Sequence, residues 1–306
     1  MSRSSSGFGA VLALAIVATA VCVSSGPAYG AGGQVSITPL FNADDVLRYS
    51  GGNFTTPSIS WDNPTGSNND NYMVTQSAAN QLAGGSNAVG INDNGFYPAT
   101  GARLYDVQLG FTNATPTGTN VVIRSTTLGS FTFDVPSNYY SQFAIFGSSG
   151  SGSTNLTITL NYATGSATVL SNVTLPDWYS GNPGTTAAGA AGTHFALTPA
   201  MSREAAAGNC PIGGCYQVPN VNGSGAYIYG INLAPDSTRV LTSVSVSYAP
   251  SSPGYTVANF VAAAGAVSST VTPAPSSVWL AVMGCLALLG YTLWFRRPAV
   301  ASGPQR

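Results

Sequence analysis

The chain has 306 residues, of which only 6% are charged, with nine basic and ten acidic side chains and a net charge of −1. It contains no lysine, and residues 31–272 carry five arginines against nine aspartates and one glutamate, a net charge of −5. A chain without a basic patch lacks the electrostatic footprint of a nucleic-acid-binding protein. Abundant β-branched and aromatic residues argue against disorder, so we expect a packed domain.

The N-terminal segment has the pattern of a signal peptide. Arg3 is the only early charge, an apolar run extends from Ala10 to Val23, and small residues follow up to Gly30. A basic start, an apolar centre and a small-residue end are the three regions of such a peptide. We therefore predict that residues 1–30 direct export and are cleaved off before Ala31. The alternative is an N-terminal anchor that stays uncleaved.

Residues 31–265 have the periodicity of β-strands. Leu156, Ile158 and Leu160 alternate with polar residues, which is typical of a strand with one buried face. Similar short segments are separated by turn clusters of Gly, Ser, Asn and Pro, and we predict one all-β ectodomain, an antiparallel, jelly-roll-like β-sandwich. The only helix expected inside it is Tyr72–Leu82. The expected strands lie at residues 35–37, 104–111, 121–123, 131–135, 142–146, 156–162, 169–175, 227–233, 240–248 and 255–261.

Two long segments interrupt the strands and are predicted to be loops. Residues 42–101 are rich in Asn, Asp and Gly, and residues 178–224 are rich in Gly, Ala and Pro. Long loops on a β scaffold are where binding residues usually lie. Exposed rings beside polar groups could stack on sugar faces, whereas the alternative places Trp61 and Trp178 in the core. The candidate ligand-binding residues are Trp61, Phe96, Tyr97, Asp177, Trp178 and Tyr179.

Aspartates in the first long segment supply the oxygen ligands that Ca²⁺ prefers. Asp62, Asp70 and Asp93 are the candidates, and none follows the spacing of an EF-hand loop. The alternative is that these Asp and Asn residues simply form turns. No other cofactor is expected.

Cys210 and Cys215 are the only cysteines in residues 31–272, in the order Cys-Pro-Ile-Gly-Gly-Cys. An exported protein meets an oxidising environment, so we predict that this pair forms a disulfide that closes a small loop. A zinc site would need two more ligands, and the chain has one histidine, His194.

Catalysis has little support in the sequence. No Gly-x-Ser-x-Gly motif occurs, and His194 lies in a Gly- and Ala-rich stretch. We therefore expect a non-enzyme. The enzymatic alternative is a secreted hydrolase that acts on surface glycan, and it would draw a carboxylate pair from four residues. These are Asp93, Asp106, Asp134 and Asp177.

The most apolar run near the C-terminus has the properties of a membrane span. It has 18 uncharged residues, 278–295, and Arg296 and Arg297 follow at once. At about 1.5 Å per residue a helix of this length covers roughly 27 Å, enough to cross a hydrocarbon core. The paired arginines are typical of a cytoplasmic flank. We predict a transmembrane helix at 278–295 with a basic cytoplasmic tail at 296–306; the alternative is a buried core helix.

A short motif precedes this run in the predicted linker, residues 266–277. It consists of Pro273, Ala274, Pro275, Ser276 and Ser277. The order of Pro-x-Pro motif, apolar helix and basic cluster resembles the PEP-CTERM sorting signal of bacterial envelope proteins, and departs from it at Ala274, where the family usually has Glu. The resemblance implies recognition by an exosortase-type membrane protease, cleavage near the motif, and delivery to the cell surface or extracellular matrix. Before processing the protein would span the membrane once.

Five stretches of the ectodomain carry a second resemblance. They are Asp93–Pro98, Asp106–Leu109, Phe131–Pro136, Leu160–Ser166 and Leu175–Tyr179. They look like a pattern in exported bacterial β-sandwich domains that are similar to the galactose-binding-like jelly roll, with Thr164 where that pattern has Asp. The resemblance covers roughly residues 40–262 and implies a non-catalytic sandwich that is often found near carbohydrate. Together the two resemblances predict an exported, non-catalytic envelope or matrix protein that binds exopolysaccharide.

Overall fold

The computed structural model describes twelve stretches of the chain. They are residues 34–35, 43–55, 57, 60–62, 69–84, 88–110, 123–125, 129–184, 186–207, 216–217, 225–249 and 257–268. The predicted signal peptide, the Cys210–Cys215 pair, the sorting motif, the apolar run 278–295 and the arginines after it lie outside these residues. Within the described stretches, no helix has the length and apolar character needed to cross a membrane.

A four-stranded antiparallel sheet carries the clearest alternation of the sequence. Along its strand β10, Leu156, Ile158 and Leu160 are buried, while the residues between them are partly exposed. The alternation predicted for this segment is therefore confirmed. The strand order is β11-β10-β16-β8, and the bounds are β8 Gly129–Asn138, β10 Thr154–Tyr162, β11 Thr168–Leu175 and β16 Leu241–Ala249.

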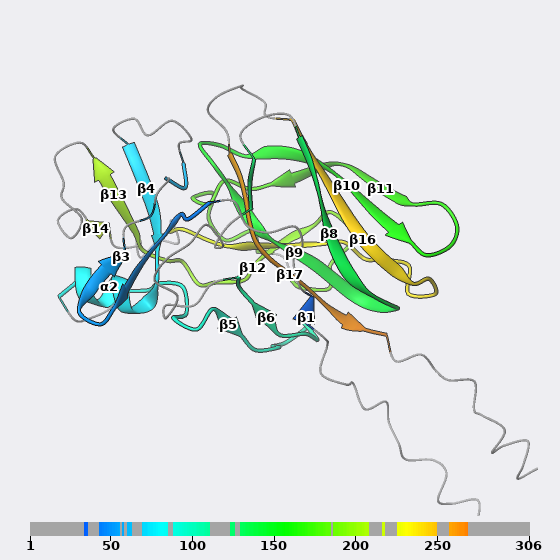
Figure 1. Ribbon diagram of the computed structural model, residues 1–306, viewed down its shortest axis with the longest axis horizontal. Coiled ribbons are helices and arrows are strands. Elements are labelled where there is room, and N and C mark those ends of the chain that lie inside the picture. Colours follow the sequence, from blue (N-terminus) through cyan, green and yellow to red (C-terminus); the bar gives the residue numbers. More distant parts are fainter. Residues whose placement is uncertain are drawn as a thin grey trace, which may run out of the picture. The chain divides into compact units, whose positions relative to one another are not determined.

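A second antiparallel sheet is built around two long neighbouring strands, β9 and β17 (Figure 1). Both are buried along nearly their whole length, on both faces. The strand order is β1-β17-β9-β15-β12, with β7 also paired to β17. The bounds are β1 Gln34–Val35, β7 Ile123–Ser125, β9 Tyr140–Gly150, β12 His194–Ala196, β15 Tyr229–Asn232 and β17 Val257–Val267.

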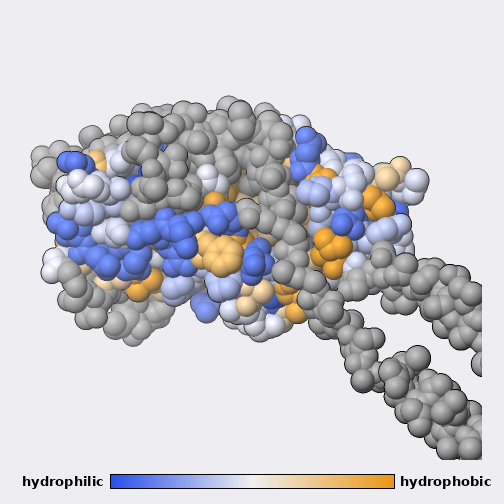
Figure 2. Space-filling model, turned by 60° about the horizontal axis from the view of Figure 1, so that its bottom comes forward, coloured by the Kyte–Doolittle hydropathy of each residue, from blue (hydrophilic) through white to orange (hydrophobic). Residues whose placement is uncertain are grey.

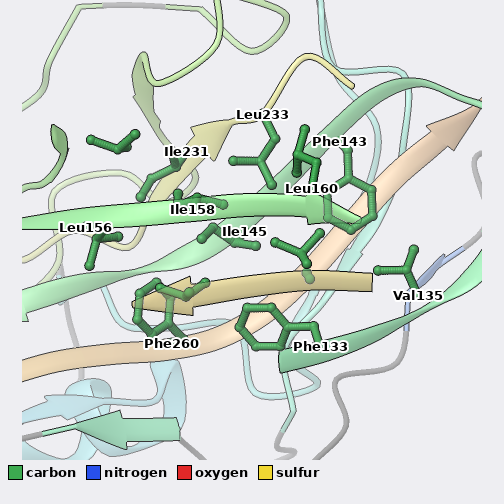
Figure 3. Packing of buried hydrophobic residues seen from close by; sticks show 14 of the residues in the cluster. Phe133, Val135, Phe143, Ile145, Leu156, Ile158, Leu160, Ile231, Leu233 and Phe260 are labelled. Carbon is green, nitrogen blue, oxygen red and sulfur yellow. The ribbon is translucent and has the colours of Figure 1, made fainter. Parts of the chain in front are cut away.

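The main hydrophobic core lies between these two sheets. Phe133 and Ile158 come from the four-stranded sheet, and Ile145, Ile231 and Phe260 come from the second. Figure 3 shows their side chains pointing toward one another between the strands. Burial of this apolar surface is the main stabilising term for such a domain. The predicted all-β class with antiparallel sheets packed face to face is confirmed.

The two segments predicted to be long loops instead pair with each other in a third sheet. Its order is β14-β13-β4-β2-β3, and only the β2–β4 pair is parallel. The prediction of loops was wrong because pairing between distant segments overrides the low strand propensity of Asn and Ala. The bounds are β2 Val46–Ser50, β3 Asn53–Thr55, β4 Asn69–Val74, β13 Arg203–Ala207 and β14 Tyr216–Gln217.

A second core explains why this third layer exists. This core contains side chains from alternate positions of β9 and β17, such as Phe146 and Ala264. It also contains Trp61 and Met73 from the first long segment and Met201 from the second. A sheet that is apolar on both faces must be covered on both. The fold is therefore a face-to-face pair of sheets with an additional layer over the far side of β9 and β17, and the predicted two-layer sandwich is corrected in this respect.

The predicted helix is shorter than expected. Helix α2 spans Gln76–Leu82, and Thr75 caps it by accepting a hydrogen bond from the backbone N–H of Ala78. The preceding residues, predicted as helix from Tyr72, belong to β4. A small hairpin follows, with strands β5 Phe96–Tyr97 and β6 Val107–Gln108.

The C-terminal boundary of the domain also differs by two residues. β17 continues to Val267, so Ala266 and Val267 belong to the strand and not to a linker. The backbone N–H of Ser268 still donates to the carbonyl of Tyr139, at 2.6 Å.

Candidate functional site

The two tryptophans predicted to stack on sugars lie in the second core. Trp61 is 0% exposed and Trp178 is 1% exposed. Their rings stack with centroids 6.0 Å apart, and the indole N–H of Trp61 donates to the Ser148 hydroxyl at 3.0 Å. Both rings cover the apolar far face of β9 and β17, and neither presents a face to a ligand. The alternative that places them in the core is correct.

Phe96 and Tyr97 lie side by side in the sequence of β5 but face opposite ways. Tyr97 is buried, and this burial raises the pKa of its phenol to about 12. Its hydroxyl accepts a hydrogen bond from the backbone N–H of Asn92 at 3.1 Å. Phe96 is 36% exposed, and of the six predicted ligand residues it alone is exposed. One isolated ring makes a small sugar-stacking surface.

Asp177 and Tyr179 are brought close to Asp62 at the turn between β9 and β10. The Asp177 carboxylate accepts a hydrogen bond from the backbone N–H of Gly152 at 2.6 Å, and Asp62 accepts one from the N–H of Ser151 at 3.3 Å. Arg203 lies over the Tyr179 ring, 4.3 Å from its centroid. The structure thus brings three predicted site residues together, and the carboxylates of Asp62 and Asp177 accept hydrogen bonds from the backbone of one tight turn.

The electrostatics of this turn are set mainly by Asp62. Its other carboxylate oxygen accepts a hydrogen bond from the Asn71 side chain at 2.6 Å and lies 3.8 Å from the Arg203 guanidinium. Burial raises the pKa of Asp62 above its ordinary value, and the nearby Asp177 charge acts in the same direction. These partners connect β4 and β13 of the third sheet to the turn between β9 and β10.

The predicted calcium ligands are used in other ways. Asp93 accepts hydrogen bonds from the backbone N–H and the hydroxyl of Ser77, in the first turn of α2. Asp62 is bonded as described above, and the side chain of Asp70 lies outside the described residues. In the part of the chain that the structure describes, no group of three or more His, Cys, Asp and Glu side chains is arranged to hold a metal ion. The geometry favours the turn-forming interpretation of Asp62 and Asp93.

The other residues considered for catalysis are His194, Asp106 and Asp134. His194 lies in β12 with its ring edge-on to Tyr229, at 6.0 Å between centroids, and burial lowers its pKa. Asp106 accepts a hydrogen bond from the backbone N–H of Ala99 at 2.7 Å. Asp134 is exposed on β8, opposite Ser243 on β16. These groups lie on different elements and have separate partners.

One concavity lies at one end of the four-stranded sheet, and no residue predicted as a site residue lines it. It has a volume of about 640 Å³, and β8, β10, β11 and β16 all contribute to it. None of its described lining residues is charged. Hydroxyls and amides alternate there with apolar atoms, and we call this concavity the polar pocket. Its lining includes Ser130, Asn155, Leu156, Thr157, Asn172, Ser247 and Tyr248.

Strand register explains how these side chains meet. Tyr248 is paired with Leu156 on one side and with Gly129 on the other. Because glycine has no side chain, the position beside Tyr248 stays open. Burial raises the pKa of Tyr248, so its phenol is a neutral hydrogen-bonding group at physiological pH.

Asn172 enters the polar pocket because β11 contains a bulge. The β10–β11 register shifts between Leu156 and Ile158, and Asn172 has a positive φ of 56°. Asn tolerates this left-handed conformation better than most residues. Bulges commonly redirect a side chain next to a binding site. An Asn inside a predicted strand, between Ser171 and Val173, was the one signal in the sequence, since Asn is depleted in strands.

No family model matches this chain, and no curated protein or solved structure matches it. The function must therefore be inferred from the polar pocket and from the pattern of the two chain ends.

Proposed function

We propose that this chain is an exported, non-catalytic protein of the bacterial cell envelope or extracellular matrix that binds exopolysaccharide in the polar pocket. Its signal-peptide pattern and its PEP-CTERM-like C-terminus support export and surface sorting by an exosortase-type protease. The protein would span the membrane once before processing and would then be released to the surface. The resemblance to galactose-binding-like domains supports the same assignment.

The polar pocket is the observation that carries the binding proposal. Its volume of about 640 Å³ is in the range typical of small-ligand sites. Asn155 and Asn172 offer amide donors and acceptors, and Thr157 and Ser247 offer hydroxyls. A neutral lining suits the hydroxyls of a sugar, because no buried charge is left without a partner when the ligand binds.

The alternative, a secreted hydrolase acting on surface glycan, has weaker support. Such an enzyme needs two carboxyl groups about 5–10 Å apart across one cleft. Asp62 and Asp177 lie near enough for their charges to interact, and both accept hydrogen bonds from the backbone of the same turn. The described lining of the polar pocket contains no carboxylate.

The test is a binding measurement with two matched variants. The protein from the exported fraction is titrated with neutral oligosaccharides derived from the exopolysaccharide of the producing cells. Asn172→Gly removes the pocket amide and keeps the left-handed backbone accessible. Asn161→Ala is the control, because Asn161 lies in the same sheet, bonds Ser243 and Ser245, and does not line the pocket.

Losing one or two hydrogen bonds at about 1 kcal/mol each should weaken binding by roughly tenfold in Asn172→Gly. The affinity of Asn161→Ala should stay close to that of the wild type. Equal affinities for all three proteins would contradict the proposal. Turnover of any glycan would favour the hydrolase.

A further inference from the structure

A second, smaller concavity contains an unusual arginine. It has a volume of about 230 Å³ and lies between the turn at residues 100–103 and the segment at residues 186–197. Thr100 and Thr186 contribute hydroxyls, whereas Phe195 and Leu197 contribute apolar surface. Arg103 is its only charged lining residue among those described. We call it the arginine pocket.

Arg103 is buried and forms no ion pair within the described part of the chain. It is 6% exposed, and its Nη2 donates to the backbone carbonyls of Tyr97 and Pro98. Its Nε is buried and has no hydrogen-bond partner among the described residues, and no ion pair joins the guanidinium to a described carboxylate. A buried arginine is almost always paired, and a buried polar atom without a partner requires an explanation.

The groups around Arg103 do not neutralise it. Asp106 is the nearest acid that acts on its charge, and the carboxylate of Asp106 is bonded to the backbone N–H of Ala99. Tyr97 and Tyr105 also face it, and both phenols are buried and neutral at physiological pH. Burial lowers the pKa of Arg103, yet a guanidinium stays protonated at neutral pH.

The turn that presents Arg103 is held in place before any ligand arrives. The backbone N–H of Arg103 donates to the carbonyl of Thr100 at 3.0 Å. The side chain of Gln142, on β9, donates to the carbonyl of Ala102 at 2.9 Å and accepts from the N–H of Leu104 at 2.9 Å. A fixed donor loses little entropy when it binds an acceptor, so the pocket is pre-organised.

We infer that the arginine pocket binds the carboxylate of an acidic sugar, such as a uronic acid unit of the exopolysaccharide. Because Nη2 already donates to two carbonyls, Nε and Nη1 are the donors left for the carboxylate, and charge-assisted bonds of this kind are short and strong. The threonine hydroxyls would bind sugar hydroxyls, and Phe195 and Leu197 would cover the apolar face of the ring. This inference rests on the proposed function, and adds to it a second subsite with a preference for acidic units.

The experiment observes Arg103 directly. The exported protein is labelled with ¹⁵N, and the side-chain Nε–H signal of Arg103 is followed by NMR during titration with glucuronate. Glucose serves as the uncharged counterpart and sulfate as the small anion. We expect a saturable shift with glucuronate, no shift with glucose, and at least tenfold weaker binding of sulfate.

Two variants complete the test. Arg103→Gln should weaken glucuronate binding at least tenfold, whereas Arg239→Gln should leave it unchanged. Arg239 is a matched control because it also donates to two backbone carbonyls, those of Thr164 and Ser166, and lies on a different loop. If Arg103→Gln does not fold, Thr186→Val should still lower the affinity several-fold, since it removes a lining hydroxyl and leaves the arginine in place.

The outcomes are distinct from those for the polar pocket. Sulfate binding as tight as glucuronate would overturn the acidic-sugar assignment and indicate a general anion site. An Arg103 signal that responds to none of the anions would overturn the inference altogether. Failure of the polar pocket would instead appear as equal neutral-glycan affinities of the wild type and Asn172→Gly, whatever glucuronate does.

Discussion

Replacement of Trp61 by alanine tests whether the third layer is part of the folded core. Truncating a fully buried tryptophan costs about 3–5 kcal/mol through lost burial and a residual cavity. Trp61 is 0% exposed and donates a hydrogen bond to Ser148, whose loss adds about 1 kcal/mol. We therefore expect Trp61→Ala to lower the free energy of unfolding by about 5 kcal/mol. This is a large share of the roughly 5–15 kcal/mol typical of a domain.

The measurement is equilibrium urea unfolding, followed by near-ultraviolet circular dichroism. Ser148→Ala and the double variant complete a cycle that isolates the coupling between the two side chains, expected at about 1 kcal/mol. Val169→Ala is the control, because Val169 is also hydrophobic and is 56% exposed on β11. Its cost should stay within about 0.5 kcal/mol.

A Trp61→Ala cost no larger than that of Val169→Ala would refute this reasoning. It would mean that the ring is accessible in solution, and the sugar-stacking role predicted for Trp61 would return.

Three further predictions concern the central strands, pH and processing. Gly147→Ala should destabilise the domain by about 3 kcal/mol in the same unfolding assay, because an added Cβ would overlap the backbone carbonyl of Asn259 on β17. An unchanged urea midpoint would contradict the close approach of β9 and β17. Burial raises the pKa of Asp62 in the folded protein above the 3.8 of an unburied aspartate. The folded state therefore binds this proton more tightly than the unfolded state. The stability that results is fully present below pH 3.8 and is lost as pH rises through the folded-state pKa. Asp62→Asn should therefore lose less stability than the wild type between about pH 4 and neutral pH, and parallel pH profiles would exclude this. Pro275→Ala should let the predicted helix extend and should slow release of the domain. In the wild type we expect a mature C-terminus near residues 272–277, which C-terminal peptide mapping measures. Finding the final arginine on every molecule would disprove sorting by cleavage.

The four-stranded sheet could be predicted from the sequence because each of its strands has one solvent-exposed face and one buried face. The alternation of Leu156, Ile158 and Leu160 with Thr and Asn carries that information directly. β17 is different, since both of its faces are buried and its second half is a run of Ala and Gly. Such a run has neither alternation nor strand propensity, so the predicted strand ended at residue 261 and missed the second half of β17.

The third sheet could not be predicted because its strands depend on partners far away in the sequence. β13 pairs with β4 across more than a hundred residues, with Glu204 opposite Tyr72. Neither strand has the pattern of a half-buried strand when taken alone. The aromatic residues of these segments were therefore predicted to bind a ligand. In the structure Trp61 and Trp178 instead pack in the core against β9 and β17.

The two pockets were missed for a related reason. Asn172 reaches the polar pocket through a one-residue bulge, and a bulge is set by the pairing of two strands. Arg103 was not noticed because an arginine is ordinarily a surface residue, and only the packing around it shows that its guanidinium is buried.

The central claim is that a neutral glycan binds in the polar pocket, and side-chain amide signals test it most directly. The exported protein is labelled with ¹⁵N and titrated with neutral oligosaccharides from the exopolysaccharide of the producing cells. We predict saturable shifts of the Asn155 and Asn172 side-chain amides, with the Asn161 amide unchanged. Binding that leaves Asn155 and Asn172 unshifted, or no binding at all, would contradict the claim.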